Sequence, residues 1–162
     1  PIILYNVPSR TGMNIAIDTV AELAKLDNIV GVKDATGDIS YTAALAAKVP
    51  EIAIYSGNDD MTVPIMSLGG KGVISVLANI LPEETHNICQ YYLDGKTDEA
   101  LKLQLDMLDV IQEQAADGYC AQVILHGALA RLRHAVIAAV VLQWNEGIKA
   151  RRLILQLTQT LI

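Results

Sequence analysis

Four short apolar runs rich in β-branched residues occur in the first 110 residues, and each is followed by an amphipathic stretch. Within the runs, polar and apolar residues do not alternate, which favours strands covered on both faces, as in a parallel sheet. A strand followed by a helix recurs about every 20–28 residues, which predicts a series of βα units. The expected strands are 1–5, 29–33, 52–56 and 72–76, and the expected helices are 14–26, 39–48, 60–68, 83–94 and 97–114.

The pattern changes after residue 115. Residues 121–144 and 147–161 are expected to form two helices separated by Gly147. The first of these is apolar nearly all round, so it needs burial against another surface. We therefore expect two segments: a βα segment over 1–115, and an apolar helical tail over 116–162 that packs on the first segment or swaps between chains.

Composition limits the class of protein. Apolar residues make up 52% of the chain and the mean hydropathy is +0.33. No apolar run reaches the ~18 residues that a membrane span needs, and no signal-peptide pattern opens the sequence. Cys89 and Cys120 lie far apart without a ligand cluster, which favours a reducing compartment. These features predict a cytoplasmic protein without a membrane partner.

Charge is distributed unevenly along the chain. Residues 1–120 carry 17 acidic and 7 basic side chains, whereas 121–162 carry one acidic and five basic. Such a change can mark a basic interaction tail or a seam between segments of different origin. The low pI of about 4.9, the few aromatic residues and the lack of a recognition motif argue against a nucleic-acid partner.

No metal or cofactor is expected. The chain has three histidines and no carboxylate cluster beside them. His86 and Cys89 are spaced to share one helix face, but two ligands do not make a zinc site.

Lys33 ends an apolar strand, where an ammonium ion is poorly solvated. Desolvation favours the neutral amine, which can attack a carbonyl and form a Schiff base. The alternative is that Lys33 leans out of the strand end into water. Tyr5 could relay protons or pack at the rim, and Arg10 could grip a carboxylate or lie on a solvated loop.

Four motifs occur in order: YNVPSRTG (5–12), GVKDATG (31–37), SGNDD (56–60) and LGGKGVISVLANILP (68–82). Together they resemble the dihydrodipicolinate synthase and N-acetylneuraminate lyase family over residues 1–111, and Arg10 favours the synthase branch. The resemblance implies a (β/α)8 TIM barrel, pyruvate as a small-molecule partner and a Schiff-base lyase of lysine biosynthesis.

The resemblance also implies roles for individual residues. Lys33 would form the imine with pyruvate, and Tyr5 would shuttle protons. Arg10 would bind the carboxylate of aspartate semialdehyde, and the backbone carbonyl of Ile74 would lie beside the lysine. For Asp59 and Asp60 we expect helix capping rather than acid–base catalysis. For the glycines of 69–72 we expect a tight turn rather than an anion cradle.

The chain also departs from the family pattern. It opens at the equivalent of the fifth strand, it contains no GTTGE-type loop for the pyruvate carboxylate, and the resemblance stops near residue 111. We therefore expect an α/β fold: the C-terminal half of the barrel, with four parallel βα units, followed by helices of unrelated or artificial origin and completed by dimerisation. The favoured function is a non-catalytic, self-associating folding unit. The alternative is a residual aldolase-type lyase that condenses pyruvate with aspartate semialdehyde through Lys33.

Overall fold

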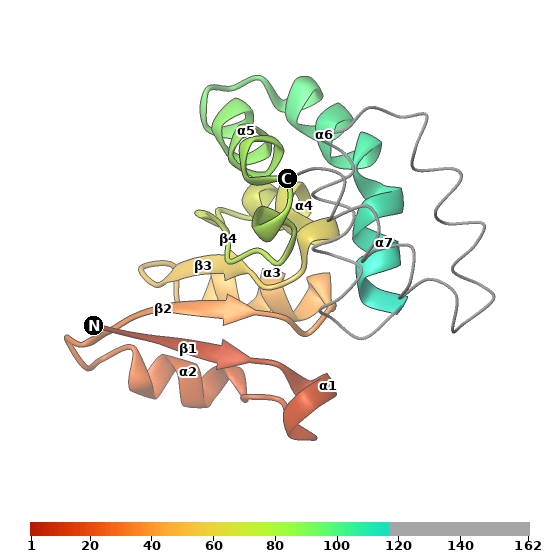
Figure 1. Cartoon of the computed structure of the whole chain (residues 1–162). Coiled ribbons are helices and arrows are strands. Elements are labelled where there is room, and N and C mark those ends of the chain that lie inside the picture. Colours follow the sequence, from red (N-terminus) through yellow and green to blue (C-terminus); the bar gives the residue numbers. More distant parts are fainter. Residues whose placement is uncertain (117–162) are drawn as a thin grey trace, which may run out of the picture. The chain divides into compact units, whose positions relative to one another are not determined.

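The computed structural model describes residues 1–116 as an α/β fold (Figure 1). The strands are β1 (Ile2–Asn6), β2 (Ile29–Asp34), β3 (Ala53–Ser56) and β4 (Gly72–Val73). The helices are α1 (Pro8–Thr11), α2 (Ile17–Leu23), α3 (Ile39–Lys48), η1 (Asp59–Met61), α4 (Thr62–Ser67), η2 (Leu77–Asn79), α5 (Pro82–Leu93), α6 (Thr97–Asp106) and α7 (Leu108–Ala116).

The strands form one parallel sheet in the order β1-β2-β3-β4, so the predicted series of four βα units is confirmed. Each strand lies beside the one before it in the chain. The carboxyl ends of all four strands therefore meet at one edge, where parallel α/β folds gather their functional loops.

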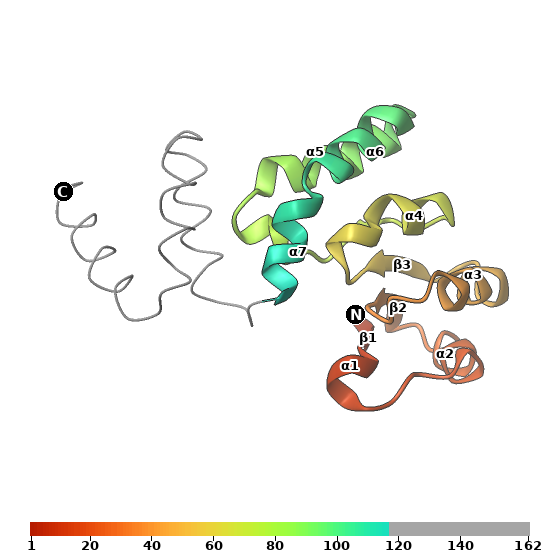
Figure 2. The same cartoon turned by 90° about the vertical axis from the view of Figure 1, so that its right-hand side faces the viewer.

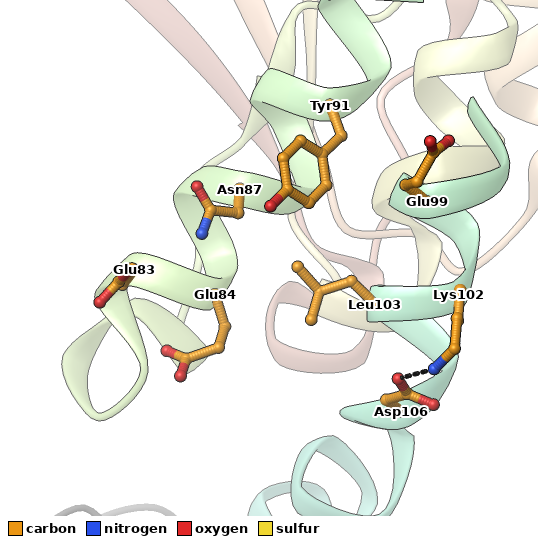
Figure 3. Close-up of a pocket in the computed structure, with 8 residues that line it drawn as sticks. All are labelled: Glu83, Glu84, Asn87, Tyr91, Glu99, Lys102, Leu103 and Asp106. Carbon is orange, nitrogen blue, oxygen red and sulfur yellow. Dashed lines mark hydrogen bonds and ion pairs between the residues drawn. The ribbon is translucent and has the colours of Figure 1, made fainter. Parts of the chain in front are cut away.

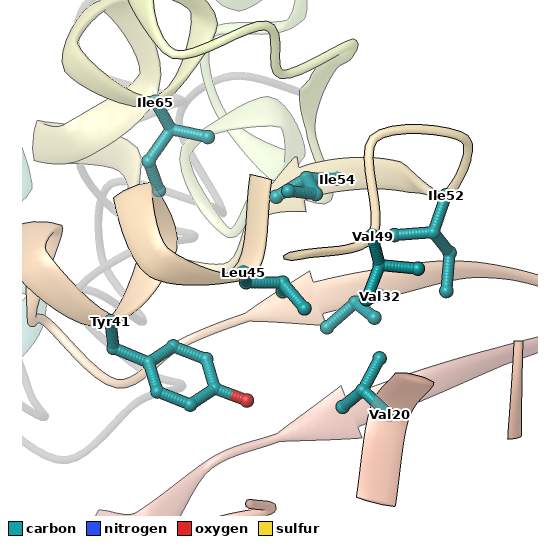
Figure 4. Close-up of a cluster of buried hydrophobic side chains, with 8 residues drawn as sticks. All are labelled: Val20, Val32, Tyr41, Leu45, Val49, Ile52, Ile54 and Ile65. Carbon is teal, nitrogen blue, oxygen red and sulfur yellow. The ribbon is translucent and has the colours of Figure 1, made fainter. Parts of the chain in front are cut away.

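Helices α2, α3 and α4 lie on the same side of the strands (Figure 2). Their apolar side chains meet those of β2 and β3 in a core that includes Val32 and Leu45, both fully buried (Figure 4). Aliphatic side chains of this kind bury well between a helix and a twisted sheet, and each stabilises the fold by about 1.5–3 kcal/mol.

Three local predictions are wrong. The loop after the first strand contains one helical turn, α1, in which Pro8 occupies the first turn. β4 ends at Val73 rather than at residue 76, because the following backbone turns toward Asp59. The single helix expected over 97–114 is divided at Met107 into α6 and α7.

Gln104 of α6 forms hydrogen bonds that hold this helix against η1 and the start of α4. Its side chain is only 4% exposed; Oε1 accepts a hydrogen bond from the Val63 N–H at 2.7 Å, and Nε2 donates to the Asp60 carbonyl at 2.9 Å. The N–H of Val63 belongs to the first turn of α4, where helices leave their donors unpaired. One buried amide thus satisfies the start of α4 and joins two distant segments.

The face of the sheet opposite α2, α3 and α4 is called here the open face, defined by Ile3, Tyr5, Lys33 and Tyr55. Ile3 and Tyr5 are 42% and 47% exposed, while Lys33 and Tyr55 are half-buried. A parallel sheet is normally covered on both faces. Among residues 1–116, only one face of this sheet has a layer of helices.

The helices predicted over 121–144 and 147–161, and most of the tail assigned to 116–162, lie outside the described residues.

Replacing Leu45 by alanine should lower the free energy of unfolding by about 3 kcal/mol, because a fully buried leucine leaves a cavity when truncated. Urea denaturation followed by circular dichroism measures the change. Leu105 on α6 is 55% exposed, so Leu105→Ala is the matched control and should cost less than about 0.5 kcal/mol. Equal losses in the two variants would contradict the assignment of the core.

Candidate active site

The strand register places three of the open-face side chains in one row. Tyr5 of β1 is paired with Lys33 of β2, and Lys33 is paired with Tyr55 of β3. The Lys33 amine lies over the ring of Tyr5, with Nζ 4.5 Å from the ring centre. The structure thus brings together the two residues that sequence reasoning assigned to catalysis.

Alternation along β2 explains how Lys33 reaches the open face. Val32 and Asp34 are buried and point toward the helices, so Gly31 and Lys33 point the opposite way. A Cβ on Gly31 would lie 3.0 Å from the Ala53 carbonyl oxygen, 3.4 Å from the Tyr55 ring and 3.5 Å from Ile3. Tyr55 and Ile3 therefore close over the glycine and leave no space for a larger residue.

Tyr55 was not among the predicted site residues. Its place beside Lys33 follows from the pairing of β2 with β3, which the sequence pattern alone does not determine. The available signal was its position directly before SGNDD, one residue from the strand end, which matches the position of Lys33 directly before Asp34.

A second row, of polar side chains, faces the helices beneath the first. Asn6, Asp34 and Ser56 are the last residues of three neighbouring strands, they are register partners, and they are all at most 2% exposed. Buried polar groups need hydrogen-bond partners. Each of these side chains finds its partners in the chain that follows its own strand.

Asp34 has the densest set of contacts. One carboxylate oxygen accepts from the Thr36 hydroxyl at 2.7 Å and the Thr36 N–H at 3.0 Å, and the other accepts from the Thr42 hydroxyl at 2.5 Å. The carboxylate is thus occupied on the helix side of the sheet. It shapes the KDATG turn and does not reach the Lys33 amine on the opposite face.

Asn6 fixes the loop that carries Arg10. Its side-chain oxygen accepts from the Ile15 N–H at 3.1 Å, and the Tyr41 hydroxyl donates to the Ile15 carbonyl at 2.8 Å. Arg10 lies exposed in α1, within this loop, at the same end of the sheet as Tyr5 and Lys33. Its predicted contact with a carboxylate substrate stays a prediction.

Ile74 follows β4 directly. Its N–H donates to the Ser56 carbonyl at 2.9 Å, which continues the pairing of β3 and β4, and its side chain is 38% exposed. The residue therefore lies at the carboxyl edge of the sheet. Its predicted role, a backbone carbonyl beside the lysine, stays a prediction.

Asp59 is a structural carboxylate that caps the helical turn η2. It accepts hydrogen bonds from the Ser75 hydroxyl and from the N–H groups of Val76 and Leu77, both at 3.0 Å. It therefore stabilises the start of η2 rather than that of its own turn. In the loop before β4, a Cβ on Gly70 would lie 2.7 Å from the Ile65 side chain, which is consistent with a tight turn.

The described residues contain no group of three potential metal ligands. His86 is exposed and Cys89 is half-buried on α5. Burial raises the pKa of the Cys89 thiol, and the charge of Asp59 acts in the same direction against a backbone hydrogen bond at Val73. A thiol kept protonated in this way is a poor nucleophile.

A groove of about 370 Å³ lies between α5 and α6, away from the strand ends (Figure 3). Half of the eight residues that line it carry carboxylates: Glu83, Glu84, Glu99 and Asp106. Lys102 is paired with Asp106 at 2.6 Å. None of the predicted site residues lines this groove.

The protonation of the Tyr41 phenol makes the stability of the fold depend on pH in the alkaline range. Burial raises the pKa of its phenol, the Asp34 charge adds to the increase, and a hydrogen bond with Asn6 opposes it. The phenol of Tyr41 loses its proton at a lower pH in the unfolded chain than in the folded chain. The stability that this raised pKa contributes is therefore fully present below pH ~10 and falls as the pH rises further.

Tyr41→Phe should therefore destabilise the protein near neutral pH, by about 1 kcal/mol for the lost hydrogen bond to Ile15. The difference from the unsubstituted chain should narrow as the pH rises from about 9 to 11. Urea denaturation at several pH values measures it. A difference that stays constant over this range would show that the Tyr41 phenol does not have a raised pKa.

Among the described residues, no helix combines the length and apolar character needed to cross a bilayer. A model of the dihydrodipicolinate synthetase family matches residues 1–134. The match extends beyond residue 111, where the resemblance described above stops, into the segment for which the sequence suggested no relationship.

Two similar proteins are 4-hydroxy-tetrahydrodipicolinate synthases. The chain is 58% identical over 112 residues to the synthase of Caldicellulosiruptor bescii. The aligned stretch covers 69% of this chain and 38% of the relative. It is 60% identical over 111 residues to that of Clostridium perfringens strain SM101, covering 68% and 38%. The chain thus spans well under half the length of the curated relatives it matches.

Solved structures of the same class of synthase also match this chain, and this chain again covers less than half of each. The synthase of Methylacidiphilum fumariolicum SolV matches with a TM-score of 0.75 and 36% identity, covering 83% of this chain and 46% of that one. The chloride-inhibited enzyme of Acinetobacter baumannii, solved with pyruvate, matches with a TM-score of 0.69 and 39% identity, covering 73% and 41%.

Proposed function

Because the chain belongs to the dihydrodipicolinate synthetase family, we propose that it is a self-associating half barrel of that ancestry, in which a second copy completes the sheet. The observation that carries this proposal is the open face. It presents Ile3 and Tyr5, each more than 40% exposed, on a parallel sheet whose layer of helices α2, α3 and α4, within residues 1–116, lies on the other face. Apolar surface of this kind favours association.

The sheet edges support a second copy as the partner. Within residues 1–116, β1 and β4 each have a strand neighbour on one side only. Such edges offer unpaired backbone groups to another strand. Two copies related by a two-fold axis would place β1 of one beside β4 of the other, twice, and would close eight parallel strands. Residues 116–162, apolar in sequence, would add to the cover in cis or by exchange.

Self-association predicts a concentration-dependent mass in sedimentation velocity experiments. Ile3→Glu places a charge on the open face and should weaken association by at least about tenfold, since it loses a buried apolar contact and desolvates a carboxylate. Leu105→Glu, on an exposed position of α6, is the matched control and should leave the mass distribution unchanged. A monomer at every concentration for the unsubstituted chain would overturn the proposal.

A second candidate function is retained Schiff-base chemistry, favoured by the contact of Lys33 with Tyr5 at the carboxyl edge. The neutral Lys33 amine would attack the carbonyl carbon of pyruvate, and loss of water from the resulting carbinolamine would give the imine. Tyr5 would assist the proton transfers, Arg10 would receive the carboxylate of aspartate semialdehyde, and the Ile74 carbonyl would border the site.

Incubation with pyruvate, borohydride reduction and peptide mass spectrometry test this chemistry. We expect the adduct on Lys33 to exceed that on the exposed Lys71, and to disappear in Lys33→Ala. That variant should keep its circular dichroism spectrum, because Lys33 lies outside the helix-covered core. Equal labelling of many lysines would mean that the motif no longer reacts selectively.

A further inference from the structure

Within the described strands, the open face carries one basic side chain, that of Lys33, and no acidic one. The strand register adds three small residues to the four that define this face: Gly31, Ala53 and Gly72. The open face is therefore apolar and aromatic around a single lysine.

The carboxylates at the same end of the sheet belong to other contacts. Asp34 and Asp59 are buried and accept hydrogen bonds from the loops around them, and Asp38 caps α3. Asp60 is exposed on η1, where its carbonyl oxygen accepts a hydrogen bond from α6. None of the ion pairs within residues 1–116 involves Lys33. A second copy of the open face would bring no carboxylate to this lysine either.

The symmetry of a closed pair of half barrels determines where the two lysines lie. All eight strands stay parallel only if the two-fold axis runs along the barrel. The open face then becomes the interior, because helices cover the other face (Figure 2). β2 and its symmetry mate are four strands apart, which places them on opposite sides of the barrel. The two Lys33 side chains therefore point toward the axis from opposite sides at the same height.

The interior of an eight-stranded barrel is just wide enough for side chains to fill. Two long side chains that approach its axis from opposite sides bring their amines close together. Formal charges of the same sign repel there, and buried charges are unfavourable without a partner. A small oxyanion on the axis would accept hydrogen bonds from both amines and supply the missing negative charge.

We propose that the paired chains bind one small oxyanion, such as phosphate, on their two-fold axis between the two Lys33 amines, and that this anion stabilises the pair. This inference rests on the self-association proposed above, since one copy contributes only half of the site. The carboxylate of pyruvate is an oxyanion of the same class. The site would therefore also gather pyruvate beside Lys33, in keeping with the selective labelling expected above.

Sedimentation velocity on the full-length chain tests the proposal, with inorganic phosphate as the probe. At pH 7, about 10 mM phosphate should lower the dissociation constant of the pair about tenfold, the factor expected if the pair binds phosphate with a Kd of about 1 mM. Sodium chloride at the same ionic strength is the reference, because it screens repulsion without occupying the site. Equal dissociation constants in phosphate and in chloride would overturn the proposal.

Lys33→Met removes the charge and keeps a long side chain. In chloride this variant should associate at least as tightly as the unsubstituted chain, because the repulsion is gone, and phosphate should have no further effect. Lys71→Met is the matched control, since Lys71 is exposed and directly precedes β4, at the amino end of the sheet. It should keep the full response to phosphate. If Lys33→Met fails to fold, Lys33→Gln replaces it.

A phosphate effect that persists in Lys33→Met, or that disappears equally in Lys71→Met, would mean that the anion binds elsewhere, and would overturn the proposal. Isothermal titration calorimetry of the associated chain adds the stoichiometry. We expect one phosphate for every two chains. One or more phosphates per chain would indicate sites that do not lie on the axis, and would also overturn it.

The same sedimentation data keep this proposal distinguishable from self-association itself. A chain that pairs equally well in phosphate and in chloride would remove the anion site and leave the half-barrel pair in place. A monomer at every concentration, in phosphate as in chloride, would overturn both.

Discussion

Successive side chains of β2 must point to opposite faces of the sheet, and the site depends on this alternation. Val32 and Asp34 enter the helix-covered side, while Gly31 and Lys33 point to the open face. A carboxylate and an amine that are neighbours in sequence are thus kept apart by the backbone between them. Asp34 takes its partners from threonines, and Lys33 is left with the ring of Tyr5.

The same alternation gives the carboxyl edge two layers. Beneath the Tyr5–Lys33–Tyr55 row lies the buried row of Asn6, Asp34 and Ser56. Each member of the lower row binds the backbone or side chains that follow its own strand: Asn6 bonds to Ile15, Asp34 to Thr36, and Ser56 to the Asn58 carbonyl at 2.6 Å. Because the lower row holds the loops in place, the side chains of the upper row remain available for chemistry or for contacts with another molecule.

The features of the fold that sequence could predict are those that depend on local pattern. The apolar runs located all four strands within a few residues, and Lys33 lies in the second strand, one residue before its last residue, Asp34. Tyr55 and the Asp34 cluster were missed, because they depend on which strand pairs with which and in what register. The end of β4 was misplaced because Asp59, seventeen residues or more away along the chain, accepts hydrogen bonds from the backbone N–H groups of Val76 and Leu77 and turns the chain that would otherwise continue the strand.

The order of the strands in the sheet equals their order in the chain. During synthesis from the amino terminus, each strand can therefore dock onto the edge left by the strand before it, without waiting for a distant segment. Contacts between successive units also keep loop closure short, which favours rapid folding. Gln104 is an exception, since it must return across more than forty residues to reach Asp60 and Val63. The nascent chain would form its sheet one βα unit at a time, and α6 would pack on the start of α4 only afterwards.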